Sequence, residues 1–299
     1  MKVFNIIFLI LFVLVSQVFS DDFQQDIFLS KNFFDLINKD KIDKTKNLIE
    51  GAGTVLSSSR ELDYNSEFAI GESIALEGFK RYGLPVDNPE LQKYVNLVGN
   101  AVVRNSSRST IPYYFVVIDS PLYNAFACPG GIIFISSALF KGIYDESELA
   151  CVLAHEVAHV SHKHALQTLQ RAKFFEGLGK ISAATMKGDD AKKFQNAVGE
   201  LQKVLFDHGL DKDMEFESDM SGMEIAYRTG YDPSGMVRVL SMLKGQENSA
   251  TKKGSWYSTH PPLNDRIQKC LGYMKKYPDG TTLAKVRNRL ELYKKKLAK

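Results

Sequence analysis

Residues 146–160 read ESELACVLAHEVAHV, and this stretch carries the pattern around which the rest of the sequence can be interpreted. Its leucines, valines and alanines, uninterrupted by glycine or proline, are typical of a buried α-helix. Four residues of α-helix turn through about 400°, so His155 and His159 point the same way, one turn apart. Two neutral imidazoles at that spacing can bind one zinc ion, and Glu156 beside them can take a proton from a zinc-bound water. The helix therefore predicts a metal centre with Glu156 as general base.

Two other interpretations of the same helix stay open. A five-residue match of this kind also arises by chance, and the histidines would then only satisfy hydrogen bonds in the core. Both lie on an otherwise apolar helix, however, where an unpartnered imidazole is costly to bury, and this favours the metal centre. A purely structural zinc site is the third interpretation, and it would require four permanent ligands.

A catalytic zinc site needs a third protein ligand, and the sequence excludes one source of it. The metzincin arrangement would require glycine at position 162 and histidine at position 165. These positions hold His162 and Ala165. A glutamate from another helix is the alternative.

Two glutamates are candidates for that ligand. Residues 211–227 form an amphipathic helical pattern in which Glu215 and Asp219 stand one turn apart on one face, beside an apolar stripe, with Glu217 on the solvent side. Glu176 lies closer to His159 in sequence. The residues alone leave Glu215 and Glu176 both open.

Around the histidine helix, the pattern predicts a few strands among many helices. β-branched and aromatic residues favour strands at 113–118, 124–128 and 132–135, the last two joined by a Pro-Gly-Gly turn. Helical spacing of apolar residues covers 66–82 and the stretch that follows Asn88-Pro89. From residue 145 the sequence is helical almost to its end. The sequence therefore predicts an α+β fold dominated by helix.

Composition limits the classes of partner. The 299 residues are 44% apolar and 24% charged, which is typical of a globular protein, and the formal net charge is only +3. A charge so close to neutral gives no reason to expect a nucleic-acid partner. The three cysteines allow at most one disulfide and lack the spacing of a zinc knuckle.

The N-terminus predicts export. Lys2 precedes an apolar stretch over 6–15, and Val18-Phe19-Ser20 ends it before two aspartates. These are the parts of a cleavable signal peptide. A retained anchor is the alternative, but the apolar run falls short of the roughly 20 residues of a spanning helix. We expect a periplasmic or secreted protein with no transmembrane helix in its mature chain.

The predicted organisation has four segments. Residues 1–20 are the signal peptide, 21–65 a helical lead-in, 66–270 the metal-binding domain and 271–299 a helical tail. The sequence does not predict the oligomeric state.

Five motifs in a fixed order resemble those of a known family. They are Asn124–Gly131, the helix stretch from Glu146 through His159, Glu215–Asp219, Gly230-Tyr231-Asp232-Pro233, and Ser258–Pro262 with Arg266-Ile267. In this order they resemble the gluzincin zinc metallopeptidases that include HtpX, BepA and the CAAX prenyl protease, and the likeness covers about residues 66–270. It implies a zincin-like fold with a small β-sheet packed on the zinc-binding helix. Since no further apolar span follows residue 20, the chain resembles the soluble, exported branch.

The resemblance also implies residue roles. It makes Glu215 the third zinc ligand and Asp219 the carboxylate that orients a ligand histidine, although Ser218 replaces the usual alanine of that motif. His260 is expected over the metal as a displaceable extra ligand, and Arg266 as a stabiliser of the oxyanion. The remaining histidines are expected to be surface or structural residues: His162, His164 and His208.

The predicted function is zinc-dependent hydrolysis of peptide bonds, with one zinc ion per chain. The expected substrates are polypeptides, in particular unfolded or damaged exported proteins. A strand at 124–128 or 132–135 would bind them by strand addition, because that mode reads backbone more than side chains. The alternative is a latent or chaperone-like binding module that keeps the zinc site but cleaves little.

Overall fold

A computed structural model of the chain describes residues 64–171, 196, 198–246, 260 and 262–297. The predicted signal peptide, the lead-in up to residue 63 and Glu176 lie outside the described residues. None of the described helices combines the length and the apolar character that crossing a bilayer requires.

Three short strands form one sheet in the order β1-β3-β2. β1 (Tyr114–Ile118) runs parallel to β3 (Ile132–Ser136), and β2 (Ala125–Cys128) pairs antiparallel with β3. β3 is thus the central strand. Since both of its edges are paired, residues 132–135 cannot accept a further strand, and within the described residues β2 lies at the edge of the sheet.

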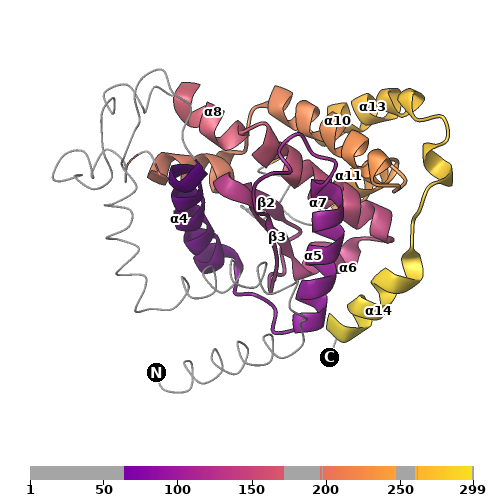
Figure 1. The fold of residues 1–299 in the computed structure, drawn as a ribbon, viewed down its shortest axis with the longest axis horizontal. Helices are drawn as coiled ribbons and strands as arrows, with labels where there is room; N and C mark the ends of the chain where they lie inside the picture. The colour runs from indigo at the N-terminus through magenta and orange to yellow at the C-terminus, as the bar shows by residue number, and fades with distance from the viewer. Residues whose placement is uncertain (1–63, 172–195, 197, 247–259, 261, 298–299) are drawn as a thin grey trace.

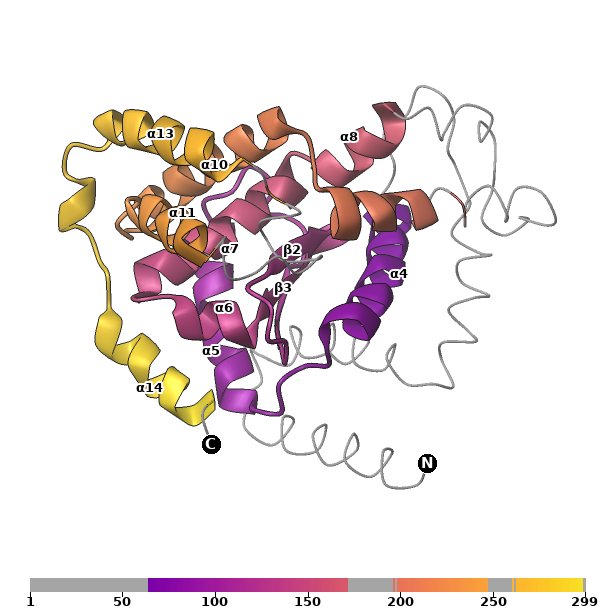
Figure 2. The same ribbon diagram turned by 180° about the vertical axis from the view of Figure 1, so that it is seen from behind.

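Helices cover both faces of the sheet, because alternate side chains along each strand point to opposite sides. One face packs against α5 (Pro89–Val103) and α7 (Glu146–Ser161). It contributes four large side chains to that core: Phe115, Val117, Ile133 and Ile135. Figures 1 and 2 show α4 (Tyr64–Tyr82) on the other side of the sheet. It packs there on a second core: Val116, Ile118, Phe126 and Phe134.

The turn between β2 and β3 packs against α4. This turn, η2 (Pro129–Gly131), holds Gly130 at a φ of +80°, where residues with a side chain are strained. A Cβ on Gly130 would also lie 2.7 Å from the Cα of Phe68 in α4. Glycine is therefore the residue that lets the hairpin pack against this helix.

The remaining elements are helical and surround this centre. Residues 198–203 lead into the π-helical turn η4 (Val204–His208). The others are α6 (Ser137–Gly142), α8 (His164–Arg171), α10 (Lys212–Arg228), α11 (Gly235–Gln246), α13 (Leu263–Tyr273), η6 (Met274–Lys276), η7 (Gly280–Thr282) and α14 (Arg287–Leu297). The predicted α+β fold, mostly helical with a small sheet against the histidine-bearing helix, is confirmed.

Helix α7 lies at the middle of the molecule, and all its residues from 146 to 160 are buried. Its N-terminus is capped by Asp145, whose side chain accepts from the backbone N–H of Glu148 at 3.1 Å. Arg238 of α11 forms ion pairs with the carboxylates of Asp145, Glu148 and Asp232. The Gly-Tyr-Asp-Pro motif thus holds the start of α7, and its role is structural.

Helix α10 packs closely on α7, and Gly222 lies at the contact. A Cβ at Gly222 would lie 3.0 Å from the backbone nitrogen of His155 and 3.1 Å from Cε of Met236. The two helices approach so closely because this residue has no side chain.

Replacing Gly222 with valine is expected to force α10 away from α7. Overpacking of this kind costs about 1–3 kcal/mol of unfolding free energy, which urea unfolding followed by circular dichroism would measure.

Gly245→Val is the matched control, because a Cβ at Gly245 meets no atom within 4 Å and the residue lies on helix α11. Equal urea midpoints for the two variants would show that the contact between α10 and α7 does not depend on Gly222.

Candidate metal centre

Four side chains from three parts of the chain converge at one buried place. His155 and His159 come from α7, Glu215 from α10, and His260 lies before α13. Each offers one ligand atom, and these atoms all lie within 4.8 Å of one another. The two Nε2 atoms of His155 and His159 are 3.0 Å apart, and the oxygens of Glu215 lie 3.6 and 3.5 Å from them. The predicted metal residues are therefore brought together.

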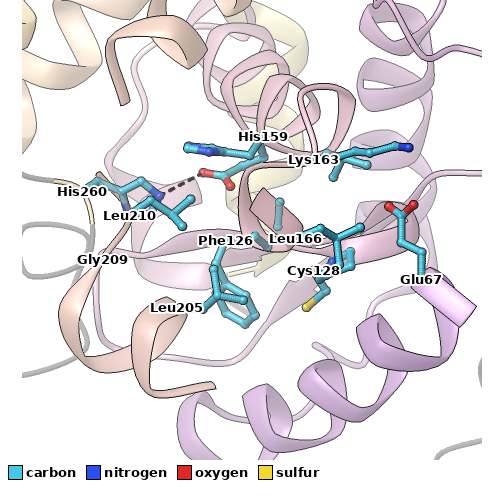
Figure 3. Close-up of a pocket in the computed structure, with 15 residues that line it drawn as sticks. Glu67, Phe126, Cys128, His159, Lys163, Leu166, Leu205, Gly209, Leu210 and His260 are labelled. Carbon is cyan, nitrogen blue, oxygen red and sulfur yellow. Dashed lines mark ion pairs between the residues drawn. The ribbon is translucent and has the colours of Figure 1, made fainter. Parts of the chain in front are cut away.

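Glu156 lies beside this cluster and is fully buried. Neither of its carboxylate oxygens has a hydrogen-bond partner within the described residues. Nε2 of His260 lies 3.8 Å from its Oε1, and the dashed line from His260 in Figure 3 marks this pair. Since a buried carboxylate is normally hydrogen-bonded, an unpartnered one beside ligand atoms suits a group that handles protons.

Asp219 and Arg266 hold the ligands from behind. Oδ1 of Asp219 lies 3.1 Å from Nδ1 of His155, as expected for the carboxylate that orients a ligand histidine. Arg266 is fully buried and donates to both oxygens of Asp219, from Nε at 2.7 Å and from Nη2 at 2.6 Å. Its Nη1 lies 2.9 Å from Oε2 of Glu215 and donates to the carbonyl oxygen of His260 at 2.8 Å.

These partners differ from the predicted role of Arg266 at the oxyanion. All three guanidinium nitrogens are directed at two carboxylates and a backbone carbonyl. The geometry instead favours Arg266 as the cation that fixes Glu215, Asp219 and the backbone of His260.

His164 is expected from the sequence to be a surface or structural residue, and the structure places it against the ligand histidine His159. It is completely buried, and its Nδ1 lies 2.9 Å from Nδ1 of His159. Its Nε2 lies 3.1 Å from Oε2 of Glu217, which is half-exposed as expected but reaches inward to this contact. In the sequence, His164 lies five residues after His159. A continuous α-helix would not place residues at that spacing on the same face, so the sequence gives no sign of this contact. His162 contacts Ser221 at 2.9 Å, and its Nδ1 lies 3.5 Å from Oε1 of Glu217.

The electrostatics of the cluster follow from its burial. Burial raises the pKa of Glu156 to about 7. Burial also lowers the pKa of His155, but the neighbouring carboxylates of Asp219 and Glu215 outweigh this effect and raise it to about 9. Burial and the neighbouring His155 hold the pKa of His159 well below its usual range.

A divalent metal fits these residues. The donors are imidazole nitrogens and a carboxylate oxygen, which zinc prefers. Oε1 of Glu215 has no hydrogen-bond partner among the residues described. When ionised, the three buried carboxylates outnumber the one buried guanidinium by two charges, which a divalent cation would balance: Glu156, Glu215, Asp219 and Arg266.

The centre borders a cleft, because Glu156, His159 and His260 are among the residues that line it. Figure 3 shows His260 and Glu67 at its opposite ends, with Phe126 and Leu166 between them. The residues of β2 from 126 to 128 line it, so the edge of the sheet borders the metal centre. Apolar side chains form much of the rest of the wall: Leu166, Leu205 and Leu210.

Comparison with known proteins gives one family match and several relatives. The family model described as "Peptidase family M48" matches residues 89–273. The chain is 28% identical over 249 residues to a beta-barrel assembly-enhancing protease of Yersinia pestis, covering 79% of this chain and 50% of that protein. The protein of the same name from Escherichia coli K12 is 26% identical over 236 residues, covering 76% of this chain and 46% of its own length.

A mitochondrial metalloendopeptidase OMA1 of Schizosaccharomyces pombe is also similar. It is 27% identical over 180 residues, which cover 59% of this chain and 51% of that protein. The chain thus spans about half the length of the curated relatives it matches.

The raised pKa of His155 predicts how metal binding depends on pH. Below about 9 the ring holds a proton that an incoming ion must displace, so affinity falls as pH falls. Between pH 6 and pH 8 we expect zinc affinity to rise by about tenfold per unit, as one proton is released per ion. Competition with a chromophoric chelator measures it.

His208→Gln is the matched control, since His208 lies outside the cluster, and it should keep both the zinc and the slope. His155→Gln should lose the ion. Zinc binding that does not change over this pH range would contradict the assignment of His155 as a ligand.

Proposed function

This chain belongs to peptidase family M48, and on that premise we propose that it is a zinc-dependent endopeptidase with one zinc ion held by His155, His159 and Glu215. The observation that carries the proposal is the state of Glu156. This buried carboxylate lies beside the ligand atoms and at the cleft, with no hydrogen-bond partner among the described residues. A structural zinc site, with four permanent ligands, would not need an unpartnered carboxylate beside it.

Zinc bound there would supply a Lewis acid for the scissile carbonyl and lower the pKa of a water molecule. Glu156 takes the proton of the attacking water and passes it to the leaving amine. Its position suits both steps, because the carboxylate is buried beside the ligand atoms and lines the cleft. Asp219 holds the ring of His155 while Arg266 holds Asp219.

His260 controls access to the centre in this proposal. Its Nε2 lies on the same side as Glu156, at 3.8 Å from that carboxylate, and its ligand atom lies within reach of the other donors. As a further ligand His260 would hold the chain in a latent state, and once displaced its imidazole would support the developing charge on the substrate oxygen. The latent or chaperone-like module is the second candidate function, and it is favoured by this proximity.

Substrates are extended polypeptides that pair with the outer edge of β2. The edge position of this strand and its place on the wall of the cleft support this binding mode. Backbone pairing gives affinity without demanding a sequence, and the apolar walls suit an apolar side chain near the scissile bond. Both properties favour unfolded or damaged proteins.

We also propose that the chain acts outside the cytoplasm, on exported proteins. The apolar stretch over 6–15 after Lys2 supports export by a signal peptide. The names of the relatives include both a beta-barrel assembly-enhancing protease and mitochondrial enzymes, so they do not point to one compartment. The proposal of export therefore depends on the apolar stretch alone.

Glu156→Gln is expected to abolish cleavage while leaving the metal in place. Losing the general base lowers the rate of casein degradation by at least about 100-fold, whereas the ligand atoms are unchanged. The measurement compares purified, zinc-loaded wild type and variant, with zinc content determined by atomic spectroscopy.

Glu77→Gln is the control, because Glu77 forms an ion pair with Arg81 on the outer side of α4. Cleavage by Glu156→Gln at the wild-type rate would refute the general base. If neither wild type nor the variants cleave casein although zinc is bound, the latent function is favoured. His260→Ala is then expected to cleave casein.

Strand addition predicts that substrate backbone matters more than side chains. N-methylation of single amides in a cleaved peptide should raise KM by about tenfold or more at positions that pair with β2, since each methyl removes a donor. Alanine substitution at the same positions is the control. Equal effects of both series would argue against pairing with β2.

A further inference from the structure

His164 reaches the metal centre through an unusual turn. Helix α7 ends at Ser161, and Lys163 follows with a φ of +56°, in the left-handed region. This reversal starts α8 with His164 folded back against the last turn of α7. The ring is fully buried there, with Nδ1 at 2.9 Å from Nδ1 of His159.

The protons along this contact determine one another. To offer a lone pair from Nε2 to a metal, neutral His159 must carry its proton on Nδ1. That N–H can donate only if Nδ1 of His164 is bare, which puts the proton of neutral His164 on Nε2. The Nε2–H then faces Oε2 of Glu217 at 3.1 Å, and a carboxylate there accepts it.

The opposite arrangement is disfavoured by Glu217. If His164 donated from Nδ1, its bare Nε2 would face the carboxylate of Glu217, lone pair against lone pair. His159 would then carry its proton on Nε2, where the metal must bind. Glu217 therefore selects the arrangement that leaves His159 ready to act as a ligand.

Geometry explains why an extra residue is needed at His159. Asp219 contacts His155 directly, at 3.1 Å from its Nδ1. Glu217 lies two residues before Asp219 on α10, about 200° around the helix, and so points away from this face. His164 spans the gap between Glu217 and His159.

We propose that His164, held by Glu217, is the positioning residue of the ligand His159 and fixes the tautomer and orientation of its ring, an inference that rests on the proposed zinc function. Both ligand histidines are then oriented from α10, one directly and one through a second histidine. None of the motifs quoted from the sequence includes His164.

The test measures zinc affinity by chelator competition for the full chain. His164→Phe keeps the ring volume but removes the acceptor, and loss of such a partner weakens zinc binding by about 10–100-fold. His164→Asn returns an acceptor oxygen near the place of Nδ1, so its loss should stay below about fivefold. Cobalt substitution should shift the visible absorption of the phenylalanine variant, since the ligand field changes.

His208→Asn is the control, because His208 is an exposed histidine of η4 and lies outside the ligand cluster. It should keep the wild-type affinity and spectrum. A folded His164→Phe protein with zinc affinity within about twofold of wild type would overturn the inference. Wild type that binds no zinc would overturn the proposed function and the inference with it.

A second pair of variants decides the matter if His164→Phe does not fold. Glu217 is half-exposed, so its replacement leaves the core intact. Glu217→Lys cannot accept from His164, whereas Glu217→Gln can. Glu224→Lys makes the same charge change two turns along α10. Zinc affinity at least about tenfold lower for Glu217→Lys than for Glu224→Lys, with Glu217→Gln near wild type, is expected; equal losses for the two lysine variants would refute the proposal.

Discussion

The close packing of α10 on α7 is the contact on which the metal centre depends. Gly222 allows it, since a Cβ there would lie 3.0 Å from the backbone nitrogen of His155. At this separation two carboxylates that stand one turn apart on α10 reach the two imidazoles of α7, Glu215 toward Nε2 and Asp219 toward Nδ1. The remaining ligand candidate, His260, is tied to the same pair of helices because Arg266 holds its carbonyl oxygen.

Buried charge is the second constraint, and it acts at both ends of α7. At the metal centre Arg266 compensates Asp219 and Glu215, and the excess negative charge is balanced either by protons or by a divalent cation. At the N-terminus, Arg238 binds the capping Asp145 together with Glu148 and Asp232. Because an uncompensated buried charge is costly, these arginines fix how α11 lies against α7 and how α13 lies against α10.

This arrangement divides the sequence motifs into two kinds. The histidine helix and the Glu215–Asp219 motif supply groups that face the metal centre. The Gly230–Pro233 motif and Glu146 serve the scaffold, since Glu146 accepts from the hydroxyls of Tyr94 and Tyr231. Glu146 also pairs with Arg289 of α14, which lies beside α5 in Figures 1 and 2. A motif that recurs with a catalytic helix is therefore not by itself catalytic.

The sequence by itself determined what depends on local periodicity. The strands, the long helices and the shared face of His155 and His159 all follow from periods of two or 3.6 residues, which hold whatever the rest of the chain does. Only the tertiary structure decided that Glu215 joins the histidines, that β2 rather than β3 borders the cleft, and that Arg266 binds carboxylates. It also decided the contact of His164 with His159. These facts depend on how helices approach and on one left-handed residue, Lys163, and no local pattern of apolar and polar residues specifies either.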